Sequence, residues 1–247
     1  MKAQKSSLFL RNVAICALTT IVSSTLLSFA TPVQASIFDG LFNKKAEGNA
    51  SGRSRGGATR SLCSQMGDKN LMALVPQSNE ALTTKDYPTF WFYLPFGGTT
   101  QSPPAQFRLL NEQKKSVLQK PLLFPLPDTK GIVNFSLPAT EKPLVAGQRY
   151  RWFFNIACMN DKGQKTNITI DGWIKRVEPS SDLVAKLKTT RPQEQYVPYA
   201  ENNIWSETFT KLAENRTTYK KEWSEILSLF QLTELKDAPI AELKPQK

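Results

Sequence analysis

The stretch YRWFFNIAC, residues 150–158, has the two-residue period of a β-strand with one fully apolar face. The side chains that share this face are Tyr150, Trp152, Phe154, Ile156 and Cys158. Large aromatic and β-branched side chains in one row are typical of a packed core. The other face, with Arg151, Phe153 and Ala157, is not plainly polar. We therefore expect either the C-terminal part of the chain or a partner to cover it.

Other short runs with strand character surround this stretch, and Gly- and Pro-containing loops separate them. They lie at residues 70–76, 87–95, 105–111, 116–124, 131–138, 148–158 and 166–179. None of them has a helical period. The pattern predicts an antiparallel β-sandwich domain over residues 63–179.

The segment 144–152 follows the pattern L-x-x-G-x-x-Y-x-W, and an aromatic strand at 87–95 precedes it. This order resembles a fibronectin type III or immunoglobulin-like module. The resemblance implies that Tyr150 and Trp152 point inward and fill the space between two sheets. Cys63 departs from the pattern, because it precedes the first clear strand and cannot form the usual bond between the sheets.

A helical period begins after Pro179, and residues 180–247 are predicted to form a C-terminal helical extension. Ser180 or Ser181 is expected to cap a first short helix, whereas residues 191–203, broken by two prolines, are expected to be irregular. The apolar side chains of two later amphipathic helices are Trp205, Phe209 and Leu212, then Trp223, Ile226, Leu227 and Phe230. A break near residues 217–218 makes these a helical hairpin, and the polar tail is expected to fray.

The hairpin must bury its apolar stripes, and the simplest receiver is the second face of the sandwich. The strand pattern assigns to this face the side chains Trp91, Tyr93, Phe153 and Trp173. Any part of it that the helices leave exposed, with the loop 95–105, is a candidate binding surface for a sugar or a protein. Glu and Lys are mixed on the polar faces of the helices, which argues against stable membrane insertion.

The N-terminal residues 1–35 have the layout of a secretory signal peptide: a basic start, an apolar stretch from Val13 to Ala30, and small or apolar residues before a cleavage site after Ala35. The alternative is an uncleaved membrane anchor. Residues 36–62 are rich in Gly, Ser, Arg and Ala, and we expect a flexible basic linker. Its arginine-containing part, residues 46–61, has no aromatic residue, so we expect no nucleic-acid partner.

The 247-residue chain has a formal net charge of +11. Without the three basic residues of the predicted signal peptide, it has 29 basic and 21 acidic residues, a net charge of +8. An exported basic protein can meet anionic envelope polymers or membrane surfaces. Acids and bases are mixed along the predicted domain, so the charge also fits a purely solubilising role.

Two cysteines lie outside the predicted signal peptide, Cys63 and Cys158, and in an exported chain they most simply form one disulfide. The chain has no histidine. This excludes Ser-His-Asp triads, His-assisted cysteine nucleophiles and the HExxH zinc site. We predict no catalytic residue, metal or cofactor. Carboxylate-pair hydrolysis needs no histidine and stays open, with Asp161, Asp171, Glu178 and Glu201 as its candidate acids. Asp161 lies in a turn motif, and Asp171 precedes Gly172 where a bulge is expected.

The chain from about 55 to 240 resembles a cyanobacterial exported family known as domain of unknown function 928. The matching segments are GGATRSLC, LMALVP, YPTFWFYLP, YRWFFNIAC, GWIKRV and AENNIWSETFTKLAE, in this order. The resemblance implies a location in the cell envelope, in the periplasm or outside the cell, and a shared fold. It supplies no reaction and no catalytic residues.

Two functions are therefore considered. The first is a non-enzymatic binding or assembly module of the envelope, with an envelope protein or polysaccharide as its partner. The second is a hydrolase that acts on envelope polymers through carboxylates. The first is favoured, because sandwich domains commonly serve recognition and no catalytic motif is present.

Overall fold

The structure is a computed structural model, and it describes residues 36–38, 52–56, 63, 69–160 and 162–246. The predicted signal peptide, most of the predicted linker and Asp161 lie outside these residues. No helix in the described part of the chain is long and apolar enough to cross a membrane.

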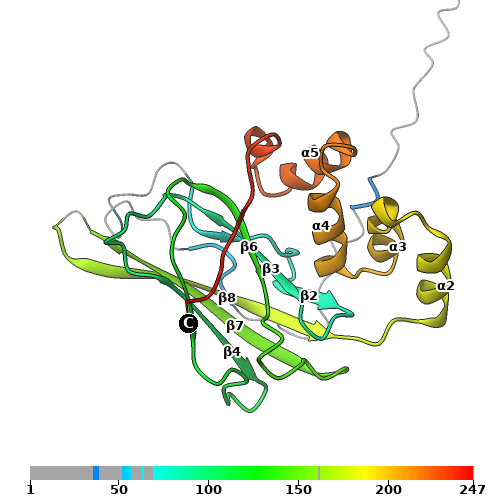
Figure 1. The fold of residues 1–247 in the computed structure, drawn as a ribbon, viewed down its shortest axis with the longest axis horizontal. Helices are drawn as coiled ribbons and strands as arrows, with labels where there is room; N and C mark the ends of the chain where they lie inside the picture. Colours follow the sequence, from blue (N-terminus) through cyan, green and yellow to red (C-terminus); the bar gives the residue numbers. More distant parts are fainter. Residues whose placement is uncertain (1–35, 39–51, 57–62, 64–68, 161, 247) are drawn as a thin grey trace, which may run out of the picture. The chain divides into compact units, whose positions relative to one another are not determined.

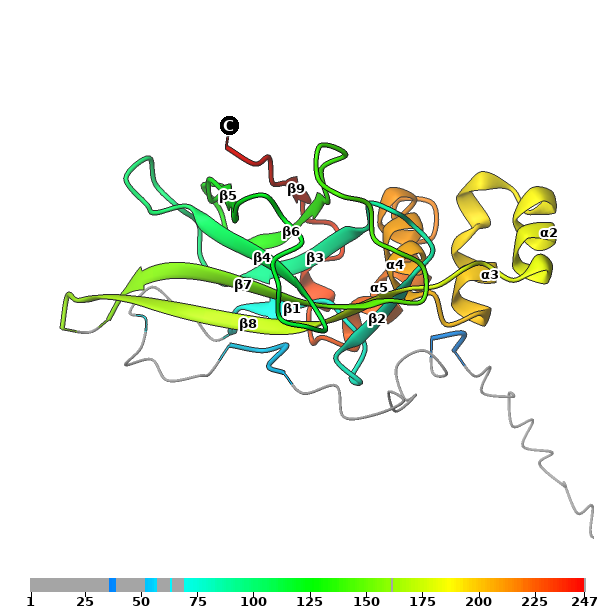
Figure 2. The same ribbon diagram turned by 90° about the horizontal axis from the view of Figure 1, so that it is seen from below.

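The strands form two sheets (Figures 1 and 2). The four-stranded sheet has the order β1-β3-β6-β9, with bounds Met72–Ala73, Thr89–Leu94, Gly131–Ser136 and Ala241–Glu242. The five-stranded sheet has the order β2-β8-β7-β4-β5, with bounds Glu80–Thr83, Lys165–Arg176, Arg149–Met159, Ala105–Asn111 and Leu122–Phe124. The predicted two-sheet arrangement is confirmed.

The prediction of purely antiparallel sheets is wrong, because each sheet contains one parallel pair. β2 runs parallel to β8, and β9 runs parallel to β6. Both added strands are short and lie at a sheet edge. Edge strands of two to four residues carry too little alternation to be found in a sequence, and the tail that was expected to fray supplies one of them.

The space between the sheets is filled from both sides by aromatic side chains. The rings of Phe92 on β3 and Phe154 on β7 are stacked with centroids 4.2 Å apart, and Trp152 meets Phe92 edge-on at 5.7 Å. Trp152 also lies against Gly172 of β8, where a Cβ atom would come within 2.4 Å of its ring. The β7–β8 pairing runs unbroken through Gly172, so the expected bulge is absent there. The even face of YRWFFNIAC is thus the core row that its pattern predicts.

The C-terminal part contains four α-helices: α2 (Ser181–Thr189), α3 (Tyr196–Glu201), α4 (Trp205–Glu214) and α5 (Lys220–Ser228). The hydroxyl of Ser180 accepts the Leu183 N–H and caps α2, as predicted. The prediction of an irregular segment at 191–203 is wrong, because it forms the 3₁₀-helix η2 (Pro192–Glu194) and α3. Pro192 and Pro198 both occupy the first turn of their helix, where no N–H bond is required.

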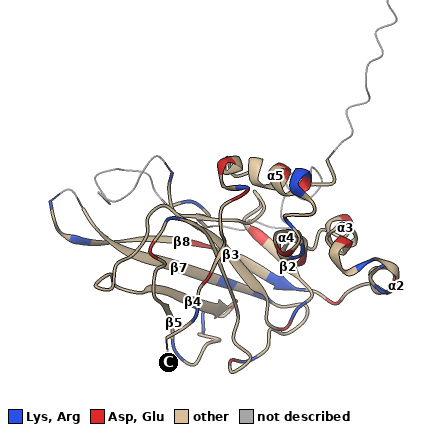
Figure 3. Ribbon diagram, turned by 45° about the horizontal axis from the view of Figure 1, so that its top comes forward, with Lys and Arg blue, Asp and Glu red and all other residues tan. Residues whose placement is uncertain are grey.

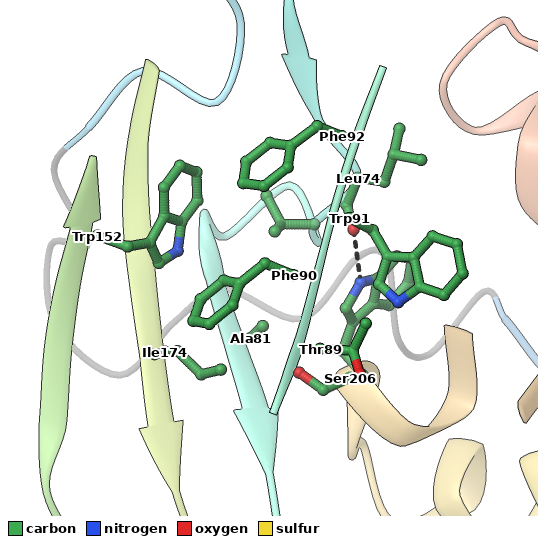
Figure 4. Close-up of a pocket in the computed structure, with 11 residues that line it drawn as sticks. Leu74, Ala81, Thr89, Phe90, Trp91, Phe92, Trp152, Ile174 and Ser206 are labelled. Carbon is green, nitrogen blue, oxygen red and sulfur yellow. Dashed lines mark hydrogen bonds between the residues drawn. The ribbon is translucent and has the colours of Figure 1, made fainter. Parts of the chain in front are cut away.

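α4, α5 and part of α3 cover the outer face of the four-stranded sheet, whereas α2 packs through Leu183 near Leu82 of β2 and Val177. Phe90 and Phe92 point from β3 toward Trp152, and Trp91 points from the other side of β3 toward α4 (Figure 4). The Trp91 ring packs on Phe209 with centroids 5.2 Å apart, and its Nε1–H donates to the Thr210 hydroxyl at 2.9 Å. The strand β3 is therefore buried on both of its faces.

A small apolar cavity lies beside these side chains, between β3, β2 and α4 (Figure 4). Its volume is about 20 Å³, which is room for a single water molecule. It is a packing defect between layers rather than a ligand site.

Parts of the predicted linker are held by the fold. Phe38 is only 1% exposed and belongs to the apolar cluster between the helices and the four-stranded sheet. Residues 52–56 bridge the two sheets through backbone hydrogen bonds. The Ala73 N–H of β1 donates to the Ser54 carbonyl at 2.8 Å, and the Asp171 N–H of β8 donates to the Arg53 carbonyl at 2.9 Å. Backbone pairing, which composition does not reveal, orders these residues.

Cys63 and Cys158 lie at disulfide distance, with Cα atoms 5.6 Å apart. This is the pair that the sequence predicts. Cys158 ends the core row of β7, and the bond closes a loop of 95 residues. A loop of this length restricts the unfolded chain by about 4–5 kcal/mol in the chain-entropy model.

A buried carboxylate joins the helical layer to the five-stranded sheet. Glu207 on α4 is 5% exposed and accepts the Thr83 hydroxyl at 2.6 Å and the Thr84 N–H at 3.0 Å, at the end of β2. Burial penalises the charged carboxylate and raises the pKa of Glu207, although the two hydrogen bonds oppose the shift.

This raised pKa predicts a specific pH dependence of stability. Above its ordinary pKa the Glu207 carboxyl keeps its proton in the folded chain but loses it in the unfolded chain, so its contribution to the free energy of unfolding falls as the pH rises through this window. Urea unfolding between pH 4 and 8 should show that Glu207→Gln lacks this decline. The exposed Glu214→Gln on the same helix should keep it. Identical pH profiles for the wild type and Glu207→Gln would contradict the assignment.

Candidate binding surface

The outer face of the five-stranded sheet carries an ordered set of charged and aromatic side chains. In the strand register, Arg108 of β4 lies opposite Phe153 of β7, which lies opposite Asp171 of β8. The next outward-facing row joins Arg151 of β7 to Trp173 of β8. These residues alternate with the core residues along each strand, so all of them point away from the space between the sheets.

Arginines and aromatic rings stack alternately across this face. We call Arg108, Phe153, Arg151, Trp173 and Arg149 the arginine–aromatic ladder. The guanidinium carbons of Arg108 and Arg151 lie 5.2 and 5.1 Å from the centroid of the Phe153 ring. Those of Arg149 and Arg151 lie 4.7 and 5.7 Å from the Trp173 ring. All four distances are within the range of cation–π attraction.

Two carboxylates bind Arg151 and Arg149 of the ladder. Arg151 donates from Nε and Nη2 to one oxygen of Asp171, at 2.9 and 2.7 Å. Arg149 donates from Nε to Glu80 of β2 at 2.7 Å. Asp171 also accepts the Arg53 N–H at 3.1 Å, so it ties the segment 52–56 to the ladder. Stacking and ion pairing together hold these side chains in one conformation.

The face has more cations than anions. Arg108 is exposed and Lys175 is half-buried, and neither forms an ion pair with another side chain in the described ranges. Basic and acidic positions lie close together on β7 and β8 (Figure 3). With Glu80 and Asp171 engaged by Arg149 and Arg151, the positive charge of Arg108 and Lys175 is left over.

The four side chains of the predicted binding surface do not share one face. Trp91 and Tyr93, which are 7% and 4% exposed, lie beneath the helices on the four-stranded sheet. Phe153 and Trp173 lie on the five-stranded sheet, in the ladder. The prediction of a single face is wrong because strand periodicity does not tell which sheet a strand joins. The expectation that the helices cover Phe153 is wrong for the same reason, since they pack on the other sheet.

The candidate acids are dispersed. Asp171 pairs with Arg151, Glu178 is exposed after β8, and Asp161 lies outside the described residues. Glu201 accepts a hydrogen bond from Lys186 at 2.7 Å. It lines a groove of about 320 Å³ between α2 and α3 that also contains Glu194.

The carboxylate of Glu194 in this groove is held in its charged form. A hydrogen bond from Arg191 lowers the pKa of Glu194, and a weaker contribution comes from the Tyr219 hydroxyl. In the described part of the chain, no group of three His, Cys, Asp or Glu side chains is placed to hold a metal ion.

Sequence reasoning missed Arg108, Arg149 and Glu80 as members of the site. The alternation of Arg149, Arg151 and Phe153 is visible in the sequence and marks a face that is neither core nor plainly polar. The contributions of β4 and β2 depend on which strands are neighbours, and this information is absent from the local pattern.

The comparisons with known proteins give a family and no function. A family model described as Domain of Unknown Function (DUF928) matches residues 55–240. No curated protein and no solved structure matches the chain.

Replacing the carboxylate that binds Arg151 is expected to lower the stability of the protein strongly. Asp171→Asn removes the charge that accepts three hydrogen bonds, and we expect it to lower the free energy of unfolding by about 2–3 kcal/mol. Asp86→Asn, which breaks an ion pair between Arg176 and a half-exposed carboxylate, should cost less than about 1 kcal/mol. Chemical unfolding at pH 7 measures both values. Equal costs would mean that the Asp171 contacts do not hold the ladder together.

Proposed function

Because the chain belongs to the DUF928 family, which has no assigned reaction, we propose its function from its geometry: an exported, non-enzymatic binding or assembly module of the bacterial cell envelope. The ladder on the five-stranded sheet is the proposed contact face. The observation that carries this proposal is the position of the helices, which cover the four-stranded sheet and leave the ladder on the opposite side of the sandwich.

The ladder has the properties of a recognition surface. Recognition requires side chains that are held in place before the partner arrives, because ordering them on binding costs free energy. Arg149 and Arg151 are fixed by carboxylates and rings, and arginine and aromatic residues are enriched at protein interaction sites. The resemblance to fibronectin type III and immunoglobulin-like modules supports the same reading, as an analogy of fold.

Three features support export. Residues 1–35 have the layout of a signal peptide. Cys63 and Cys158 lie at disulfide distance, and disulfides persist in oxidising compartments. The positive charge of the rest of the chain suits an environment of anionic polymers.

The alternative is a hydrolase whose carboxylates lie in the groove between α2 and α3. The groove has the volume of a ligand site and contains Glu194 and Glu201. Hydrolysis by paired carboxyl groups needs one of them to carry a proton, usually through a raised pKa. The pKa of Glu194 is instead lowered, and Glu201 is bound by Lys186, so the geometry supports the binding module better.

Sedimentation with isolated cell envelopes tests the proposal. The protein, purified after export from cells that express the full chain, should sediment with envelopes. Arg108→Gln, which removes an exposed ladder cation, should reduce the bound fraction severalfold. Lys188→Gln removes the same charge from an exposed position on α2 and should bind as the wild type does. Equal loss in both variants, or no sedimentation of the wild type, would overturn the proposal.

A further inference from the structure

We propose that the ladder and the neighbouring Lys175 bind an anionic polysaccharide, whose acidic groups pair with Arg108 and Lys175 while the polysaccharide lies across β4, β7 and β8. This inference rests on the proposed function and names the chemistry of the partner. It follows from the stacking of guanidinium groups on the rings, from the positions of the two unpaired cations, and from the neutral side chains in the row next to Arg108.

The ladder offers N–H groups rather than ring faces. Phe153 and Trp173 are each flanked by two guanidinium groups, so stacking of a neutral sugar on them would have to displace an arginine. A guanidinium that stacks through its flat face keeps its N–H donors at its edge. Arg108 is exposed and has no ion-pair partner among the described side chains, so its edge is available to a carboxylate or sulfate.

The two unpaired cations lie at well-separated positions on the face. Arg108 and Asp171 are two strands apart in the same register row, and Lys175 lies four residues beyond Asp171 on β8. With strands about 4.8 Å apart and a rise of about 3.3 Å per residue, the Cα atoms of Arg108 and Lys175 are roughly 16 Å apart. A single small anion would contact both only if the two long side chains converged on it, whereas a polymer with repeated acidic groups can pair with each cation where it lies.

The neighbouring row of the same face favours a sugar polymer. Gln106, Asn155 and Thr169 lie in register next to Arg108, Phe153 and Asp171, on the side away from Lys175. A polymer that pairs with Lys175 and Arg108 and continues past Arg108 meets them. These neutral side chains donate and accept hydrogen bonds, which suits hydroxyl groups. A membrane that takes up aromatic side chains, or a nucleic acid that stacks its bases, would use free ring faces, and each ladder ring has two guanidinium groups beside it.

Binding of polygalacturonate to the exported protein tests this inference, with neutral dextran of similar length as the comparison. Calorimetric titration in low salt should show binding of polygalacturonate and none of dextran. Arg108→Gln and Lys175→Gln should each weaken the affinity about fivefold, as expected for the loss of one exposed ion pair. The affinity of Arg108→Lys should fall between those of the wild type and Arg108→Gln, because lysine keeps the charge and lacks the paired N–H donors of the guanidinium group. Lys188→Gln should bind as the wild type does.

Each contrary result has a distinct meaning. All variants should keep the wild-type free energy of unfolding, so that a loss of affinity reports the loss of a direct contact with the polysaccharide. Binding of dextran and polygalacturonate with equal affinity would overturn the ionic mechanism. Arg108-dependent binding to phosphatidylglycerol vesicles, with no binding of polygalacturonate, would replace the polysaccharide with a lipid surface. Arg108-dependent sedimentation with envelopes, without binding of polygalacturonate, would overturn this inference and leave the proposed function standing.

Discussion

Burial of β3 on both faces is the constraint on which the other layers depend. Phe90 and Phe92 fill the space toward the five-stranded sheet, and Trp91 and Tyr93 anchor the helices on the opposite side. A strand with large apolar side chains at successive positions cannot be left at a wet surface. The result is a three-layer arrangement of five-stranded sheet, four-stranded sheet and helices, in which the ladder faces away from the helical layer.

The same constraint explains why the ladder is charged. No helix in the described ranges covers the sheet face where the ladder lies, so its aromatic side chains must be shielded from water by other residues. Arginines shield them by stacking on Phe153 and Trp173. Asp171 then balances Arg151 and also holds the segment 52–56 that lies between the sheets. One carboxylate thus connects the proposed contact face to the segment that joins the two sheets.

Local patterns predicted the parts of the fold that depend on local chemistry. The even row of β7, the strand β4, the Ser180 cap and the helical hairpin follow from period, capping and spacing. The assignment of strands to sheets could not be predicted, because Trp91 and Phe153 lie in similar aromatic strands whose neighbours are distant in sequence. β2, β9 and residues 52–56 owe their order to pairing with distant strands. The sequence therefore predicted Phe153 and Trp173 as members of the site but not Arg108, Arg149 or Glu80.

The central claim is that the helices cover the four-stranded sheet and that the ladder lies on the exposed side of the molecule. Hydroxyl-radical footprinting of the five tryptophans, read by mass spectrometry, tests this claim directly. Four of them, Trp91, Trp152, Trp205 and Trp223, are at most 7% exposed, whereas Trp173 is partly exposed in the ladder. The account predicts that Trp173 is oxidised fastest. Oxidation of Trp91 as fast as Trp173 would contradict it, because the helices would then not cover the sheet.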